Sequence, residues 1–147
     1  TPYFENEKCW KLLVNNLCKS AFQNGKLVIN SSGQSYRNFI ALDEVVRAIH
    51  HLLELNNEIK FNRIYNLGST DTVQIIDIAI RIQKELKNSF DYDWPIETNK
   101  SSIVNTQEKS FMFSTEKIIQ TGFRPNYSGK EISSLLDYCK NKFQNEI

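Results

Sequence analysis

Segments with apolar residues at helical spacing alternate along this chain with short segments rich in branched residues. This alternation constrains the fold more than any other feature. From Lys8 to Asn24, apolar residues recur at helical spacing, and Gly25 follows where a helix C-cap is expected. Lys26–Asn30 is rich in branched residues and leads into the turn Ser31–Gly33, so it reads as a strand. Helix and strand in this order predict an α/β fold.

The same alternation continues through the middle of the chain. Arg37–Ala41 and Arg63–Gly68 are predicted to be short strands. Between them a helix is expected from Asp43, which can cap it, to about Leu55. One apolar stripe of this helix consists of Val46, Ile49, Leu52 and Leu53.

The last 80 residues hold three more predicted helices. The first follows a turn at 69–72 and carries apolar residues from Ile75 to Leu86. Asn88–Lys109 has no sustained period, which predicts an irregular loop with at most one strand. A short helix is expected from Ser114 to Gln120, and a capping box at Ser128 opens a closing helix that ends near Phe143.

Charge and composition exclude several classes of partner. The chain of 147 residues has 18 basic and 17 acidic residues and a net charge of +1, so neither a nucleic acid nor a membrane surface is an expected partner. His50 and His51 are adjacent on a helix, and the three cysteines lack CxxC spacing, which predicts no metal site. We expect reduced thiols in a cytoplasmic protein.

Catalytic motifs give no candidate in this chain. None of the five glycines forms a dinucleotide-binding or Walker loop. Tyr138 and Lys142 match a YxxxK spacing, but two fixed letters arise easily by chance, and we interpret the pair as surface packing on the last helix. No nucleophile can be linked to either histidine. We therefore predict no catalytic residue.

Arg37 is the candidate for ligand binding. It lies in the stretch QSYRNFIALDEVVRA, at the edge of a predicted strand. The planar guanidinium matches phosphate oxygens, and each charge-assisted hydrogen bond contributes about 1.5–3 kcal/mol. An ordinary ion pair with Asp43 or Glu44 explains the same residue equally well, and the sequence pattern leaves both interpretations open.

Three blocks carry a resemblance to a known family. They are NGKLVINSSGQSYRNFIALDEVVRAI, RIYNLGSTDTVQIIDIAIRI and FMFSTEKIIQTGFRPNYSGKEISSLLDY. In order and spacing they resemble the C-terminal part of the NAD-dependent epimerase/dehydratase family, the extended short-chain dehydrogenases that act on nucleotide sugars. The resemblance implies an α/β fold, the C-terminal portion of an extended Rossmann-type enzyme, with mixed short strands and about five helices. Residues 1–147 would be its substrate-binding C-terminal region, without the N-terminal Rossmann half.

The resemblance also implies roles for individual residues. Arg37 would contact the diphosphate of a sugar nucleotide, and Val28 and Asn30 would line its base. The start of the first helix, represented by Lys11 and Leu13, would contact the nucleotide moiety. Two departures from the family pattern concern the diphosphate site. Asn38 stands where relatives have Asp, and the segment 104–109 lacks a second arginine, which leaves Lys109 as its substitute.

The implied function is substrate binding in an NAD(P)-dependent nucleotide-sugar epimerase or dehydratase. NAD or NADP would be bound mainly by the N-terminal half, without a metal, and this part alone would be inactive. Because 64–67 resembles a strand that joins the Rossmann sheet, its unpaired edge predicts a homodimer or aggregation. The first alternative is a non-catalytic binding or scaffold domain derived from the same fold. The second is an interaction module unrelated to the family.

Overall fold

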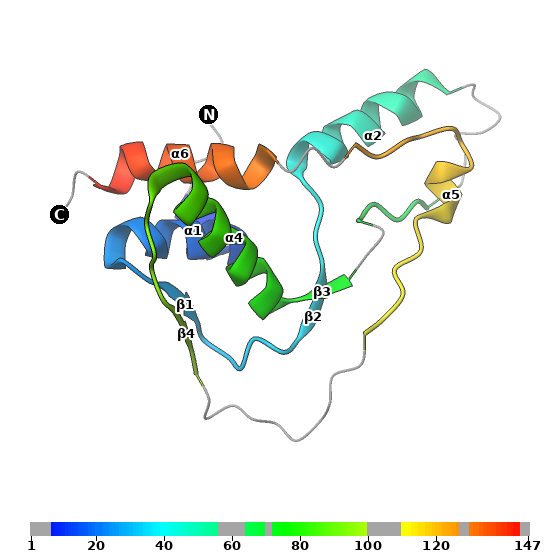
Figure 1. The fold of residues 1–147 in the computed structure, drawn as a ribbon. Coiled ribbons are helices and arrows are strands. Elements are labelled where there is room, and N and C mark those ends of the chain that lie inside the picture. The colour runs from blue at the N-terminus through cyan, green and yellow to red at the C-terminus, as the bar shows by residue number, and fades with distance from the viewer. Residues whose placement is uncertain (1–6, 56–63, 70–71, 100–109, 127–129, 145–147) are drawn as a thin grey trace. The chain divides into compact units, whose positions relative to one another are not determined.

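The computed structural model describes residues 7–55, 64–69, 72–99, 110–126 and 130–144. These residues form five α-helices, a 3₁₀ helix and four short strands, so the predicted α/β class is confirmed (Figure 1). The chain divides into two compact units. The first unit consists of Thr1–Ser35, Gln74–Glu108 and Gly129–Ile147, and the second of Tyr36–Val73 and Lys109–Ser128.

The first helix forms close to where its sequence predicts it. A 3₁₀ helix, η2 (Glu7–Lys11), precedes α1 (Leu13–Asn24), so the α-helix begins five residues later than Lys8. Gly25 ends it in the left-handed conformation, with φ of 61°, and its N–H donates to the carbonyl of Ala21. A residue without a Cβ adopts this conformation at low cost, and the predicted C-cap is confirmed.

Strand β1 (Leu27–Ile29) pairs in parallel with β4 (Ile96–Thr98), and Val28 lies opposite Glu97 (Figure 1). The predicted loop from Asn88 is therefore wrong in part. Helix α4 (Ile75–Phe90) continues past Asn88 and ends at Asp91, whose φ is 58°. The one strand allowed in this segment is β4, and residues 100–109 lie outside the described residues.

The core of the first unit lies between α1, α4, β1 and α6 (Lys130–Phe143). Its fully buried large side chains are Phe22, Leu17, Leu27, Ile82, Leu86, Leu136, Cys18 and Cys139. Each helix contributes residues spaced three or four apart, as an amphipathic helix packed on one face does. The closing helix is confirmed, while the capping box predicted at Ser128 lies outside the described residues.

The second unit contains β2 (Tyr36–Asn38), α2 (Leu42–Glu54) and α5 (Glu116–Ile119). Strand β2 pairs with β3 (Thr72–Gln74), whose last residue is assigned to the first unit. Helix α2 begins one residue before Asp43. Its N-cap is Ala41, which caps without a side-chain bond, so the prediction that Asp43 caps the helix is wrong. The acidic side chains of Asp43 and Glu44 lie in the first turn, where the helix dipole favours them.

The short helix α5 is also shorter than predicted. Its N-cap is Thr115 and it ends at Ile119, whereas Ser114 and Gln120 were the expected limits. The hydroxyl of Ser114 still accepts the N–H of Glu116, at 3.4 Å. Gly122 follows with a positive φ of 94°, as a residue that stops a helix does.

The strand predicted at 63–68 is wrong for its described part. Residues 64–69 have no regular structure, and strand β3 begins at Thr72, the last residue of the predicted turn 69–72, of which 70 and 71 lie outside the described residues. Side chains hold this segment: Lys117 Nζ donates to the carbonyl of Ile64 at 3.1 Å, and Asn66 Nδ2 donates to the carbonyl of Ser114 at 3.0 Å. A branched sequence becomes a strand only when a neighbouring strand completes its hydrogen bonds.

Helix length bears on membrane insertion. Within the described parts of the chain, no helix has both the length and the apolar character that a membrane crossing requires.

Candidate functional site

The turn before Arg37 is fixed by backbone hydrogen bonds. Gly33 has a φ of 77°, and its carbonyl accepts the N–H of Ile76 at 2.9 Å. Two residues later, the carbonyl of Ser35 accepts the N–H of Ile75 at 3.1 Å. A Cβ at Gly33 would lie 3.2 Å from the Cβ of Ile76, so this position favours glycine both by conformation and by space. The chain therefore enters β2 from a defined position.

Arg37 lies on β2 with its side chain exposed to solvent. Its Nη1 donates to the carbonyl of Tyr36 at 2.7 Å, and its other guanidinium N–H groups have no partner among the described residues. The alternative, an ion pair with Asp43 or Glu44, does not occur among the described residues, where Glu44 pairs with Arg47 instead. An arginine with four uncommitted donors is chemically able to bind an anion.

Asn38, one residue further along β2, connects this strand to the segment after Leu67. Its Nδ2 donates to the carbonyl of Ser69, and its Oδ1 accepts the N–H of Ser69, both at 2.9 Å. Gly68, the residue before Ser69, is buried. A Cβ at Gly68 would lie 2.6 Å from Phe113 Cε1. Because a carboxylate cannot donate, Asn38 serves here in a way that Asp could not.

The sequence named Glu44 only as an alternative ion-pair partner of Arg37, whereas the structure makes it a buried, hydrogen-bonded carboxylate. Only 3% of it is exposed, yet its charge is compensated: Arg47 Nη1 donates to Oε1, and the N–H of Asn126 donates to Oε2 at 2.9 Å. Arg47 Nη2 donates in turn to the carbonyl of Arg124 at 3.1 Å. Glu44 lies four residues before buried Ala48 on the same helix face, and no pattern in the sequence indicated that this face would bury a carboxylate.

This arrangement is a clamp on the chain between Phe123 and Asn126. The guanidinium of Arg47 also lies 5.6 Å from the centroid of the Phe123 ring, within the range of a cation–π contact. Both carboxylate oxygens of Glu44 accept hydrogen bonds from protein groups, and Arg47 donates to Glu44 and to the carbonyl of Arg124. We therefore assign it a structural role and not a catalytic one.

Two cavities lie in the second unit. The smaller, of about 10 Å³, has room for about one water and is lined mainly by core residues such as Leu67, Ile118 and Phe123. The larger is an open depression of about 360 Å³. Its lining residues are Ile64, Asn66, Ser114, Glu116, Lys117 and Gln120. Arg37 lines neither cavity. In the larger one, Asn66 and Lys117 donate to the backbone carbonyls of Ser114 and Ile64, and Gln120 donates to the carboxylate of Glu116.

Four of the remaining predicted site residues lie in the first unit. Val28 is half-buried on β1, and Asn30 is exposed directly after that strand. Lys11 is exposed at the end of η2, and Leu13 is half-buried at the first position of α1. Lys109 lies outside the described residues. The structure thus places Arg37 in one unit and these four residues in the other.

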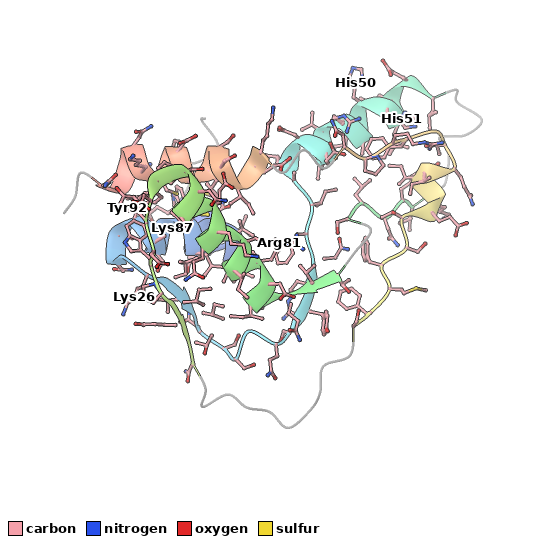
Figure 2. The ribbon with its side chains drawn as sticks, in the orientation of Figure 1. Lys26, His50, His51, Arg81, Lys87 and Tyr92 are labelled. Atoms are coloured by element: carbon pink, nitrogen blue, oxygen red, sulfur yellow. The ribbon has the colours of Figure 1, made fainter. Side chains whose placement is uncertain are left out.

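Neither the thiols nor the histidines form a reactive centre. Burial raises the pKa of the Cys18 thiol, and it raises the pKa of Cys139 to about 12, so both thiols stay protonated at neutral pH. His51 Nε2 lies 2.9 Å from the hydroxyl of Thr121, whereas His50 lies near Glu54 (Figure 2). Among the residues described, no group of three or more His, Cys, Asp or Glu could hold a metal ion.

The YxxxK pair is accounted for by packing. Lys142 Nζ donates to the hydroxyl of Tyr138 at 3.4 Å, and the Tyr138 ring stacks on that of Trp10 with 6.1 Å between centroids. Trp10 is itself part of the buried core of the first unit. A tyrosine held against this core is consistent with the interpretation as packing.

Comparison with known proteins places the fold. No protein-family model matches the sequence, and no curated protein matches it. Solved structures do match. An NAD-dependent NDP-hexosamine 5,6-dehydratase involved in tunicamycin biosynthesis has a TM-score of 0.68 and 20% identity, and covers 93% of this chain. A UDP-glucuronic acid 4-epimerase from Bacillus cereus has a TM-score of 0.68 and 18% identity over 91% of the chain.

A third neighbour is a UDP-N-acetylglucosamine 4-epimerase from Methanobrevibacter ruminantium M1, with a TM-score of 0.57 and 20% identity over 90% of this chain. The match covers 42%, 41% and 39% of the three neighbours' own chains, so this chain spans about two fifths of their length. The fold is the α/β arrangement of the C-terminal part of these sugar-nucleotide enzymes, as the sequence resemblance implied.

Proposed function

We propose that this chain is the substrate-binding portion of an NAD(P)-dependent nucleotide-sugar epimerase or dehydratase. The observation that carries the proposal is Arg37, an exposed arginine whose guanidinium keeps most of its donors uncommitted among the described residues, directly after a backbone-anchored turn. The likeness of the fold to enzymes of this class supports the same function. Neither support depends on a catalytic residue within the chain.

In this proposal the chain binds and orients a sugar nucleotide. Arg37 donates to oxygens of the diphosphate, where its planar fork can make two parallel hydrogen bonds. Val28 and Asn30 border the base, Lys11 and Leu13 contact the nucleotide moiety, and Lys109 adds a second positive charge. Holding the substrate in one orientation lowers the entropic part of the barrier for a reaction at the sugar ring.

The cofactor is not assigned to residues of this chain. NAD or NADP supplies hydride chemistry when bound, but its pyrophosphate requires a glycine-rich turn at a helix N-terminus. The five glycines of this sequence do not form that pattern. We also propose a cytoplasmic location, which the three free cysteines support.

Titration of UDP-glucose and of UDP into the protein, followed by calorimetry, tests the role of Arg37. We expect Arg37→Ala to weaken binding about 10- to 100-fold, because one or two charge-assisted hydrogen bonds are lost. Arg37→Lys keeps the charge but not the fork and should be intermediate. Arg81→Ala is the matched control, since Arg81 is an exposed arginine on α4 outside the proposed site (Figure 2).

The same titration separates this proposal from its alternative. Equal affinity of the Arg37→Ala variant and the unmodified protein would contradict diphosphate binding at this residue. Failure of the unmodified protein to bind either nucleotide would favour the alternative, a non-catalytic binding or scaffold domain derived from the same fold.

A further inference from the structure

Three thiols meet where η2 and α6 pack on α1. Cys9 lies on η2, Cys18 on α1 and Cys139 in the C-terminal half of α6, and all three belong to the described part of the chain. The charge of a Cys139 thiolate acts on the Cys18 thiol, and the charge of a Cys9 thiolate acts on Cys139. Charges act on one another in this way over short distances. Cys139 therefore has both other thiols close to it, and the three are here called the thiol cluster.

Aromatic packing joins η2 directly to α6. Trp10 follows Cys9 in the sequence and Tyr138 precedes Cys139, and the two rings stack with 6.1 Å between their centroids. The backbone of Cys9 is also fixed, because its carbonyl accepts a hydrogen bond from Asn15 Nδ2 at 3.0 Å. Contact between the residues next to Cys9 and Cys139 holds the two backbones toward the short separation that a disulfide needs, about 4.4–6.8 Å between Cα atoms.

The members of the thiol cluster differ in their access to solvent. Cys18 and Cys139 are fully buried, whereas Cys9 is partly exposed. A small-molecule disulfide in solution reacts with a thiol that it can reach and that can lose its proton. Cys18 and Cys139 meet neither condition at neutral pH, so Cys9 is the thiol at which an oxidant in solution first reaches the cluster.

Two ammonium groups act on the sulfur of Cys139. Burial raises the pKa of this thiol, while the positive charges of Lys19 and Lys142 act in the opposite direction. Both lysines lie beside the same ring, with Nζ 5.2 Å and 5.9 Å from the centroid of Phe143. A positive charge near a thiol stabilises the thiolate that forms when the sulfur attacks a second sulfur. Cys139 is therefore placed to react with a neighbouring sulfur that has already been oxidised.

We propose that Cys9 and Cys139 form a disulfide when the protein meets a small-molecule disulfide, RSSR, and that this bond ties η2 to α6. In the first step the sulfur of Cys9 attacks RSSR, the mixed disulfide Cys9–S–S–R forms, and one RSH leaves with the proton of Cys9. In the second step the sulfur of Cys139 attacks that of Cys9, and a second RSH leaves with the proton of Cys139. Two protein thiols are oxidised and RSSR is reduced to two thiols. The inference does not rest on the proposed nucleotide-sugar function.

Incubation with glutathione disulfide, followed by mass spectrometry of the denatured protein, tests the link. The expected product is lighter than the reduced protein by two hydrogen atoms, and Cys18 is its one thiol that still reacts with iodoacetamide. Cys9→Ser should form no disulfide, because the oxidant does not reach the two buried thiols. Cys139→Ala should stop at the mixed disulfide of Cys9 with glutathione. Cys18→Ala is the matched control and should still form the link.

Stability gives a second measurement of the same link. Oxidation should raise the urea midpoint of the unmodified protein, because a bond between residues 9 and 139 restricts the unfolded chain, and should leave the midpoint of Cys9→Ser unchanged. The proposal would be overturned by a mixed disulfide at Cys9 that persists in the unmodified protein, by three thiols that stay free, or by a disulfide that contains Cys18. Unchanged circular dichroism of the reduced variants confirms that they fold.

Discussion

At the scale of single residues, polar side chains with defined partners hold the second unit together. Asn38 bridges β2 to Ser69, and Glu44 holds Arg47 and the N–H of Asn126. These hydrogen bonds join segments up to 82 residues apart in sequence. Because each has a defined donor and acceptor, they specify which segments meet, whereas hydrophobic contacts are not directional. Arg37 differs from them because most of its donors face solvent, as a ligand-binding residue requires.

Replacing Asn38 tests the bridge at this scale. Asn38→Asp removes the donor to the carbonyl of Ser69 and sets a negative charge beside it, so the free energy of unfolding should fall by about 1–3 kcal/mol. Asn88→Asp is the matched control, because Asn88 is exposed on α4. Urea unfolding followed by circular dichroism measures both. A loss in Asn38→Asp no larger than in the control would show that the bridge adds no stability.

At the scale of elements, α1 and α6 enclose two protonated thiols in the core of the first unit. Burial raises the pKa of both Cys18 and Cys139 above that of an ordinary thiol, and to about 12 for Cys139. Both side chains are fully buried, so water does not reach the sulfur atoms to stabilise a thiolate. The packing of these helices is thereby coupled to pH.

Stability of the first unit should fall at alkaline pH for this reason. The unfolded thiols lose their protons near pH 9 while the folded ones keep theirs, so the stabilisation is complete below pH 9 and is lost as the pH rises toward 12. Each thiol contributes up to about 1.4 kcal/mol per pH unit. Urea midpoints at pH 8, 9 and 10 measure the slope.

Cys139→Ala is the control for the alkaline slope. It destabilises the protein at every pH by opening a cavity, but it should reduce the slope between pH 9 and 10 by about half. Equal slopes for this variant and the unmodified protein would show that the thiols do not cause the loss.

At the scale of the whole molecule, the two units differ in how much core they have. The first unit buries apolar residues from three long helices and a parallel strand pair, whereas the buried cluster of the second consists of Ala48, Ile118 and Phe123. Less buried apolar area means less stability, so the second unit should open at lower free energy than the first.

Hydrogen exchange with a pair of matched core variants tests this difference. Amides of α1, α4 and α6 should exchange more slowly than those of α2 and α5. Ile118→Ala should lower the free energy of opening of the α2 amides by about 2–5 kcal/mol and leave that of the α1 amides unchanged. Leu136→Ala should lower protection in α1 and α6. If either variant lowered protection equally in both units, the chain would unfold as one cooperative body.

Local patterns sufficed to predict several elements. The helical period of 8–24, its glycine C-cap and the branched run of β1 depend on residues close together in the sequence, and the structure has the cap, the strand and an α-helix from Leu13 to Asn24. The limits of α2 and α5 differ from the predicted ones by one or two residues, and their N-caps are Ala41 and Thr115, neither of which makes a side-chain cap hydrogen bond. Helix ends fray, so local sequence fixes them less precisely than the helix interior.

The sequence by itself determined the order of the helices, the apolar periodicity of each helix, the strand β1 and the presence of an arginine after a glycine turn, since these follow from local backbone preference and side-chain type. Only the tertiary structure decided that Glu44 is buried beside Arg47, that Asn38 binds Ser69 and that 64–69 forms no strand. Such outcomes depend on which distant segment supplies a hydrogen-bond partner or excludes water, and a local pattern does not contain that information.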